Sequence, residues 1–207
     1  MTWITIAATH YLLFSIPSGD LLGISSFTRI DTVTVPDVFM SIITVSESND
    51  LDCNEIQSVL EKDKDSIDYL GVRSDSDPLE FPDLYRTIKS VKPKGLKVML
   101  ISNGCNPETL DDLVGAGYVH SMDILIGPKL TEEQKECMTI LEDNKCKFAV
   151  TVNASEHDEE SIRQLSKDVK GCFMFIIRTD KNKPLKNSEL SALTSAAKAS
   201  TWNVRTA

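Results

Sequence analysis

Continuous apolar runs alternate along the chain with segments of helical spacing. Runs such as Val38–Val45 and Cys172–Ile177 predict strands that are buried on both faces. Between them, apolar residues three and four positions apart predict amphipathic helices. The other predicted strands are Ile67–Val72, Leu96–Ile101, Val119–Ile126, Cys146–Val152 and Trp202–Arg205, and the predicted helices are Leu51–Lys62, Pro82–Val91, Pro107–Val114, Thr131–Asp143, Glu156–Val169 and Ser188–Ala199.

About six strand–helix units follow one another in this pattern. Strands separated by helices require a parallel sheet with right-handed crossovers. Two α/β architectures fit, an open doubly wound sheet and a full or partial β/α barrel. Both place ligands at the carboxyl ends of the strands.

The first 17 residues are apolar, but no Lys or Arg occurs before Arg29, so the charged start of a secretory signal is missing. Threonines and a histidine interrupt the run, which makes it a poor membrane span. We expect strands Trp3–Thr9 and Tyr11–Ile16, or one hairpin. Residues 1–34 are therefore predicted to form an N-terminal hairpin extension, and residues 35–207 the main domain.

Charge and cysteine content narrow the function. The net charge of −9 argues against nucleic-acid or anionic-membrane partners, because phosphates would be repelled. The five cysteines include no CxxC pair, so neither a disulfide framework nor a zinc site is predicted. A reducing cytoplasm is the expected compartment.

Several turn motifs occur in a fixed order. They are LGISSFTRID at Leu22–Asp31, SDSDPL at Ser74–Leu79, SNG followed by Asn106 and Pro107 at Ser102–Gly104, and SMDI at Ser121–Ile124. This order resembles the radical-SAM enzymes that activate glycyl-radical enzymes, such as the activators of pyruvate formate-lyase and anaerobic ribonucleotide reductase. The resemblance implies a partial (β/α)6 barrel of radical-SAM type. It also implies a crevice in which S-adenosylmethionine would meet Ser76, Asp77, Ser102, Asn103 and Asp123.

The chain differs from that family in the loops that hold the iron–sulfur cluster and S-adenosylmethionine. The family holds an iron–sulfur cluster with a CxxxCxxC loop after the first barrel strand, and here the corresponding loop has only Cys53. Cys53 and Cys105 are weak candidate metal ligands, and no cluster is expected. Asp75 and Ser76 replace glycines that let the backbone approach the cofactor. Binding of S-adenosylmethionine therefore stays an open possibility.

Two of the candidate site residues can be interpreted as structural or as functional. Asp77 before Pro78 is typical of a turn but also keeps a carboxylate that an amine could bind. Asp123 lies within a predicted strand, where a carboxylate needs a partner.

Three functions remain open. The first is a degenerate radical-SAM-like protein, a non-catalytic accessory or regulatory subunit that assists the activation or maturation of a radical or metal enzyme. The second is an enzyme that uses the crevice for other chemistry. The third is an active radical-SAM enzyme whose cluster ligands come partly from a partner protein.

Overall fold

The computed structural model describes residues 22–47, 51–180 and 185–207, which form one eight-stranded sheet with six α-helices. The strands pair in chain order from β1 to β8, with β1 antiparallel to β2 and all later pairs parallel. The strands are β1 Gly23–Asp31, β2 Met40–Ser46, β3 Tyr69–Ser74, β4 Lys97–Ser102, β5 Ser121–Ile126, β6 Lys147–Asn153, β7 Met174–Arg178 and β8 Val204–Thr206. The helices are α1 Cys53–Asp63, α2 Leu84–Val91, α3 Pro107–Gly115, α4 Glu132–Asp143, α5 Glu159–Asp168 and α6 Asn187–Lys198.

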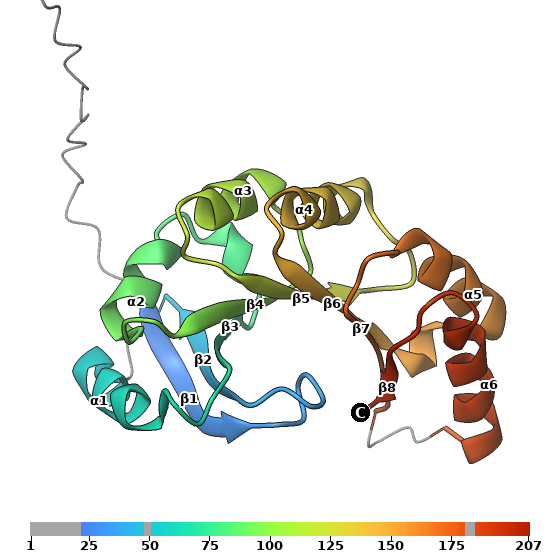
Figure 1. Cartoon of the computed structure of the whole chain (residues 1–207), viewed down its shortest axis with the longest axis horizontal. Coiled ribbons are helices and arrows are strands. Elements are labelled where there is room, and N and C mark those ends of the chain that lie inside the picture. Colours follow the sequence, from blue (N-terminus) through green and yellow to red (C-terminus); the bar gives the residue numbers. More distant parts are fainter. Residues whose placement is uncertain (1–21, 48–50, 181–184) are drawn as a thin grey trace, which may run out of the picture.

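The sheet curves into an arc, and the helices cover its convex side (Figure 1). Because β1 and β8 are the two ends of the sheet, the barrel is open on one side. This arrangement confirms the predicted α/β partial barrel. The predicted strands Trp3–Thr9 and Tyr11–Ile16 lie outside the described residues.

Strand β1 was not predicted from the sequence. It pairs antiparallel with β2 and has two register irregularities along its length. Its second half is largely exposed, so the apolar alternation that marks a strand is weak there. The helix predicted from Glu156 begins three residues later, at Glu159, because the Asp158 side chain accepts a hydrogen bond from the backbone N–H of Ser161 and caps α5. A separate 3-10 turn covers Ala154–Glu156.

Strand alternation produces two apolar layers. Side chains such as Val98, Leu100 and Ile124 point outward and pack against the helices. Their neighbours point into the concave side and form a second cluster. Its buried members are Val35, Met40, Ile42, Met99, Ile101, Ala149, Met174 and Ile176.

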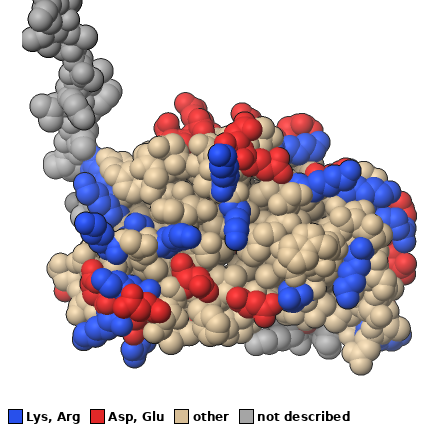
Figure 2. Space-filling model, viewed as in Figure 1, with Lys and Arg blue, Asp and Glu red and all other residues tan. Residues whose placement is uncertain are grey.

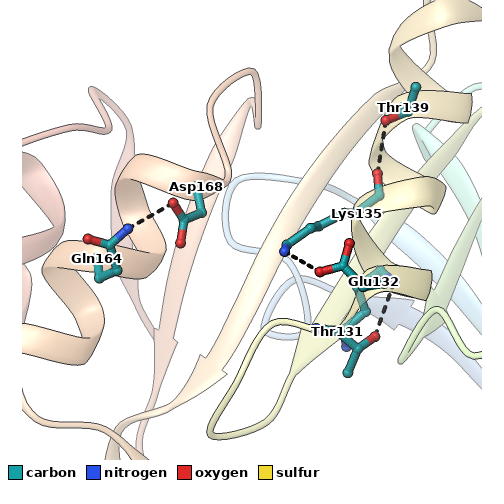
Figure 3. A network of polar contacts seen from close by, with 7 residues as sticks. Thr131, Glu132, Lys135, Thr139, Gln164 and Asp168 are labelled. Carbon is teal, nitrogen blue, oxygen red and sulfur yellow. Dashed lines mark hydrogen bonds and ion pairs between the residues drawn. The ribbon is translucent and has the colours of Figure 1, made fainter.

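The outer helices are polar on their solvent side. Thr131 accepts a hydrogen bond from the backbone N–H of Gln134, and the Gln134 side chain accepts one from the backbone of Thr131, which confirms the predicted capping box. Lys135 pairs with Glu132 on α4, and Gln164 bonds to Asp168 on α5 (Figure 3).

Acidic side chains gather along the upper edge of the molecule, over α3 and α4 (Figure 2). Within the described ranges, no helix has the length and apolar character needed to cross a membrane.

Candidate functional site at the carboxyl ends of the strands

A cavity of about 430 Å³ lies at the carboxyl ends of β5, β6 and β7. Ligands of parallel β/α folds bind at this end of the sheet, because the loops that follow the strands converge there. The cavity is lined by Leu125, Ile126, Gly127, Thr151, Asn153, Glu156, Arg178, Thr179 and Asp180.

Asp123 lies on the concave side of β5, next to the residues that line the cavity. Its neighbours in the chain, Met122 and Ile124, pack outward against the helices, so strand alternation turns Asp123 inward. The Asp123 side chain is fully buried. Oδ1 accepts a hydrogen bond of 2.7 Å from the hydroxyl of Thr151 on β6. Oδ2 is buried and has no hydrogen-bond partner among the described residues.

Burial determines the acidity of Asp123. Removal of the carboxylate from water raises its pKa and outweighs the Thr151 hydrogen bond and the nearby Arg178 charge, which lower it, so that the pKa is about 6. Near neutral pH the site therefore holds a buried negative charge with one unused oxygen. Such an oxygen can accept a hydrogen bond from an ammonium, amide or hydroxyl group of a ligand.

Arg178 does not form an ion pair with Asp123. It ends β7 and lines the cavity, and its Nη2 donates a 2.7 Å hydrogen bond to the backbone oxygen of Thr34. Thr34 belongs to the turn between β1 and β2, which is 144 residues away in sequence. The turn and the cavity are therefore joined through one guanidinium group.

The β1–β2 turn crosses the open side of the barrel toward β7 and β8 (Figure 1). Its Val35 is fully buried and packs in the concave apolar cluster with Met99 and Ile176. Asp37 of the turn pairs with Arg205 on β8 at 2.8 Å. We call residues 32–39 the closing turn, because they fill the concave side between the two ends of the sheet.

Asp77 has a different environment on the helix side of the sheet. It is 1% exposed, and its carboxylate accepts hydrogen bonds from Ser102 Oγ at 2.8 and 2.9 Å and from the backbone N–H of Asn103 at 2.5 Å. It also caps the 3-10 turn Pro78–Glu80 by accepting from Leu79 N. These bonds use the Asp77 carboxylate to tie the loop after β3 to the end of β4.

The structure brings together three of the five predicted site residues, Asp77, Ser102 and Asn103. Ser76 is exposed in the preceding loop, and Asp123 lies apart on the concave side with Thr151. Sequence reasoning missed Thr151 and Arg178. A signal for both exists, because each is a polar residue within or directly after an otherwise apolar strand run.

The five thiols do not gather at one place, although Cys137 on α4 lies beside the loop that carries Cys105, with its Sγ 3.6 Å from the backbone oxygen of Gly104. Cys53 begins α1 after β2, Cys105 follows β4, and Cys146 and Cys172 precede β6 and β7 at the opposite end of the sheet. Burial and the Asp77 charge raise the pKa of Cys105 to about 11, which keeps this thiol protonated. Within the described residues, no group of three or more Cys, His, Asp or Glu side chains could hold a metal ion. The residues present therefore do not fit the three-thiolate site that an iron–sulfur cluster of this kind needs.

The fold resembles solved structures of SuiB from Streptococcus suis. The structure of SuiB bound to S-adenosylmethionine matches with a TM-score of 0.60 at 12% identity, over 76% of this chain and 42% of that one. The structure of SuiB bound to its precursor peptide SuiA matches with a TM-score of 0.59 at 12% identity, over 77% and 43%. The chain thus corresponds to less than half the length of these neighbours. No protein-family model matches the sequence, and no curated protein matches it.

These likenesses concern the fold alone. They support the α/β partial barrel that the structure shows. They do not test the resemblance of the turn motifs to the activating enzymes of glycyl-radical enzymes.

Proposed function

We propose that the chain is a radical-SAM-like domain without a cluster of its own, which serves as a non-catalytic accessory subunit. The observation that carries this proposal is the distribution of the thiols over both ends of the barrel. Cys53 is the only cysteine in the sequence between β2 and β3, where the family places three. A fold can keep its packed core while its site is released from the original chemistry.

The closing turn also supports an accessory role. Val35 occupies the concave side, and contacts to Arg178 and Arg205 hold the turn against β7 and β8. A partner would therefore meet a filled barrel and bind its rims or outer surface. SuiB has been solved with a precursor peptide, and we propose a protein or peptide partner for this chain as well.

A second candidate function is the binding of a small ligand in the cavity at the carboxyl ends of the strands. The unpartnered Oδ2 of Asp123 and the guanidinium of Arg178 at the cavity favour a ligand that carries both a donor and an anionic group. S-adenosylmethionine is one such molecule, and SuiB has been solved with it.

The accessory proposal is tested by anaerobic reconstitution of the full chain with iron and sulfide. The measured quantities are iron and sulfide per chain and absorbance near 400 nm, in the natural protein and in Cys53→Ala. We expect little iron, and the same amount in both proteins. About four iron atoms per chain in the natural protein, lost in Cys53→Ala, would overturn the proposal.

The second candidate is tested by thermal unfolding with S-adenosylmethionine as the probe. A ligand that binds only the folded state raises the melting temperature. We expect a rise that Asp123→Asn abolishes and that Asp111→Asn, an exposed substitution on α3, preserves. No rise at millimolar probe in the natural protein would exclude this ligand.

A further inference from the structure

Lysines gather at the amino-terminal end of the parallel strands, opposite the cavity. Lys94 and Lys97 lie at the start of β4, and Lys145 and Lys147 lie at the start of β6. All four are exposed. The chain as a whole has 31 acidic and 22 basic residues, so this cluster of lysines is opposite in sign to the net charge of the protein.

A groove of about 380 Å³ runs between these lysines. Its lining includes three lysines and no carboxylate residue: Tyr69, Lys97, Val114, Gly117, Val119, His120, Lys145, Cys146 and Lys147. A second hollow of about 410 Å³ shares Tyr69 and Lys97 with it. The second hollow adds Lys94 and two acids, of which Asp68 is bonded to the backbone N–H of Phe39.

The lysines of the groove are not neutralised locally. Lys64, which lines the second hollow, pairs with Glu61, and Lys135 on α4 pairs with Glu132. Within the part of the chain that the structure describes, Lys97, Lys145 and Lys147 form no ion pair. Their charges therefore add to one positive field over the groove.

The pKa of His120 responds to the positive charges around the groove. Its Nδ1 accepts a 3.3 Å hydrogen bond from the backbone N–H of Val98. Burial lowers the pKa of His120, and the charges of Lys92 and Lys97 lower it further. An anionic group in the groove would oppose the two lysine contributions, so His120 offers a spectroscopic signal of binding.

We propose that this groove, defined by Tyr69, Lys97, His120, Lys145 and Lys147, docks an acidic segment of a protein partner. The proposal rests on the accessory role and names the chemistry of the partner. Complementary charge of this kind steers association and fixes the choice of partner.

The shape of the groove favours an extended segment over a compact anion. Lys97 and Lys147 come from β4 and β6, which β5 separates, so their charges are spread across the sheet. The shared residues Tyr69 and Lys97 connect the groove to the second hollow. The half-buried ring of Tyr69 supplies apolar contact between the charges. Several carboxylates along one peptide can meet separate lysines, whereas one phosphate cannot.

The test uses the full chain and a fluorescent peptide of six consecutive glutamates, with a six-glutamine peptide as a neutral probe. Fluorescence anisotropy measures the dissociation constant at low salt. In the triple variant Lys97→Gln, Lys145→Gln, Lys147→Gln we expect affinity to fall by at least about tenfold, since each lost charge contributes a fraction of the binding free energy. The matched control is Lys89→Gln, Lys167→Gln, Lys198→Gln, which removes equal charge from α2, α5 and α6.

The proposal predicts that the control variant binds within about twofold of the natural protein, and that added salt weakens binding. Saturating peptide should raise the pKa of His120 in an NMR titration. Equal binding by both triple variants, or displacement of the peptide by an equal concentration of inorganic phosphate, would overturn it. Iron content is measured independently, so a failure here is separable from a failure of the accessory proposal.

Discussion

The hydroxyl of Thr151 donates to Oδ1 of Asp123 across adjacent parallel strands at 2.7 Å, and among residues 22–47, 51–180 and 185–207 the Asp123 carboxylate has no other side-chain hydrogen bond. The pair lies on the concave side of the barrel, while the chain neighbours of Asp123 pack outward against the helices. A buried carboxylate with an unused oxygen costs stability when it is charged. That cost makes Asp123 a measurable feature of the fold, independent of any ligand.

Asp123 should make the protein less stable as the pH rises from about 4 to about 6. Its pKa is raised to about 6 in the folded protein, above the value of 3.8 for an ordinary aspartate. The folded state then binds more protons than the unfolded state between these values, so the free energy of unfolding falls with pH and levels off above pH 6. A difference of this size between the folded and unfolded pKa values corresponds to a fall of roughly 3 kcal/mol in the free energy of unfolding.

Urea unfolding at pH 4 and pH 7 measures this effect. Asp123→Asn should remove most of the fall, so its stability relative to the natural protein improves between the two pH values. Thr151→Val should instead raise the pKa of Asp123 further, because it removes the hydrogen bond that favours the charged form. If Asp123→Asn and the exposed control Asp111→Asn respond alike to pH, the buried charge is not responsible.

Asp77 should prove structural. Asp77→Ala leaves the Ser102 hydroxyl and the backbone N–H groups of Leu79 and Asn103 without their acceptor in a buried site. We expect a loss of about 2–4 kcal/mol, because each unsatisfied buried donor carries a desolvation cost. Asp77→Asn keeps one acceptor oxygen and should cost less.

Chemical denaturation of both Asp77 variants provides the measurement, with Asp75→Ala in the exposed part of the same loop as the control. A loss below about 0.5 kcal/mol in Asp77→Ala would mean that the carboxylate is free for another purpose, since surface substitutions typically fall within that range.

Local signals in the sequence were sufficient for the helices and the parallel strands. The Thr131 and Gln134 capping box lies within four residues, and its partners need no other part of the fold. Buried strands such as β7 are marked by their own continuous apolar runs. These features predicted a parallel α/β sheet and left an open doubly wound sheet and a β/α barrel as alternatives. The partial barrel was predicted from the resemblance that the order of turn motifs carries.

The site could be predicted only in part, because its contacts join distant segments. Asp77 meets Ser102 across 25 residues, and Arg178 meets Thr34 across 144. The position of the closing turn was not predictable for a further reason. Val35 is buried while Val33 in the same turn is exposed, and this difference depends on where the β1 hairpin places the turn. No periodicity in the sequence encodes that position.

Asp37 should tolerate glycine better than alanine. Its φ of 64° lies in the left-handed region, which costs a residue with a Cβ atom about 1 kcal/mol. Asp37→Gly removes that strain and loses only the exposed ion pair with Arg205, which is worth little. Asp37→Ala loses the ion pair and keeps the strain. Thermal unfolding should therefore rank Asp37→Gly above Asp37→Ala, and the reverse order would show that the ion pair dominates.

Shortening Val35 should loosen the closing turn from the concave side. Val35 is fully buried in the concave apolar cluster that includes Met99 and Ile176, so Val35→Ala removes apolar contacts and leaves a void, at a cost of about 1–3 kcal/mol. The turn should then exchange faster with solvent, and hydrogen exchange of the amides near Thr34 measures this directly. Val33→Ala is the matched control, because Val33 lies two residues earlier in the same turn and is 67% exposed. Faster exchange in Val35→Ala alone would show that one buried side chain holds the turn in place, whereas equal exchange in both variants would assign that role to the contacts of Arg178 and Arg205.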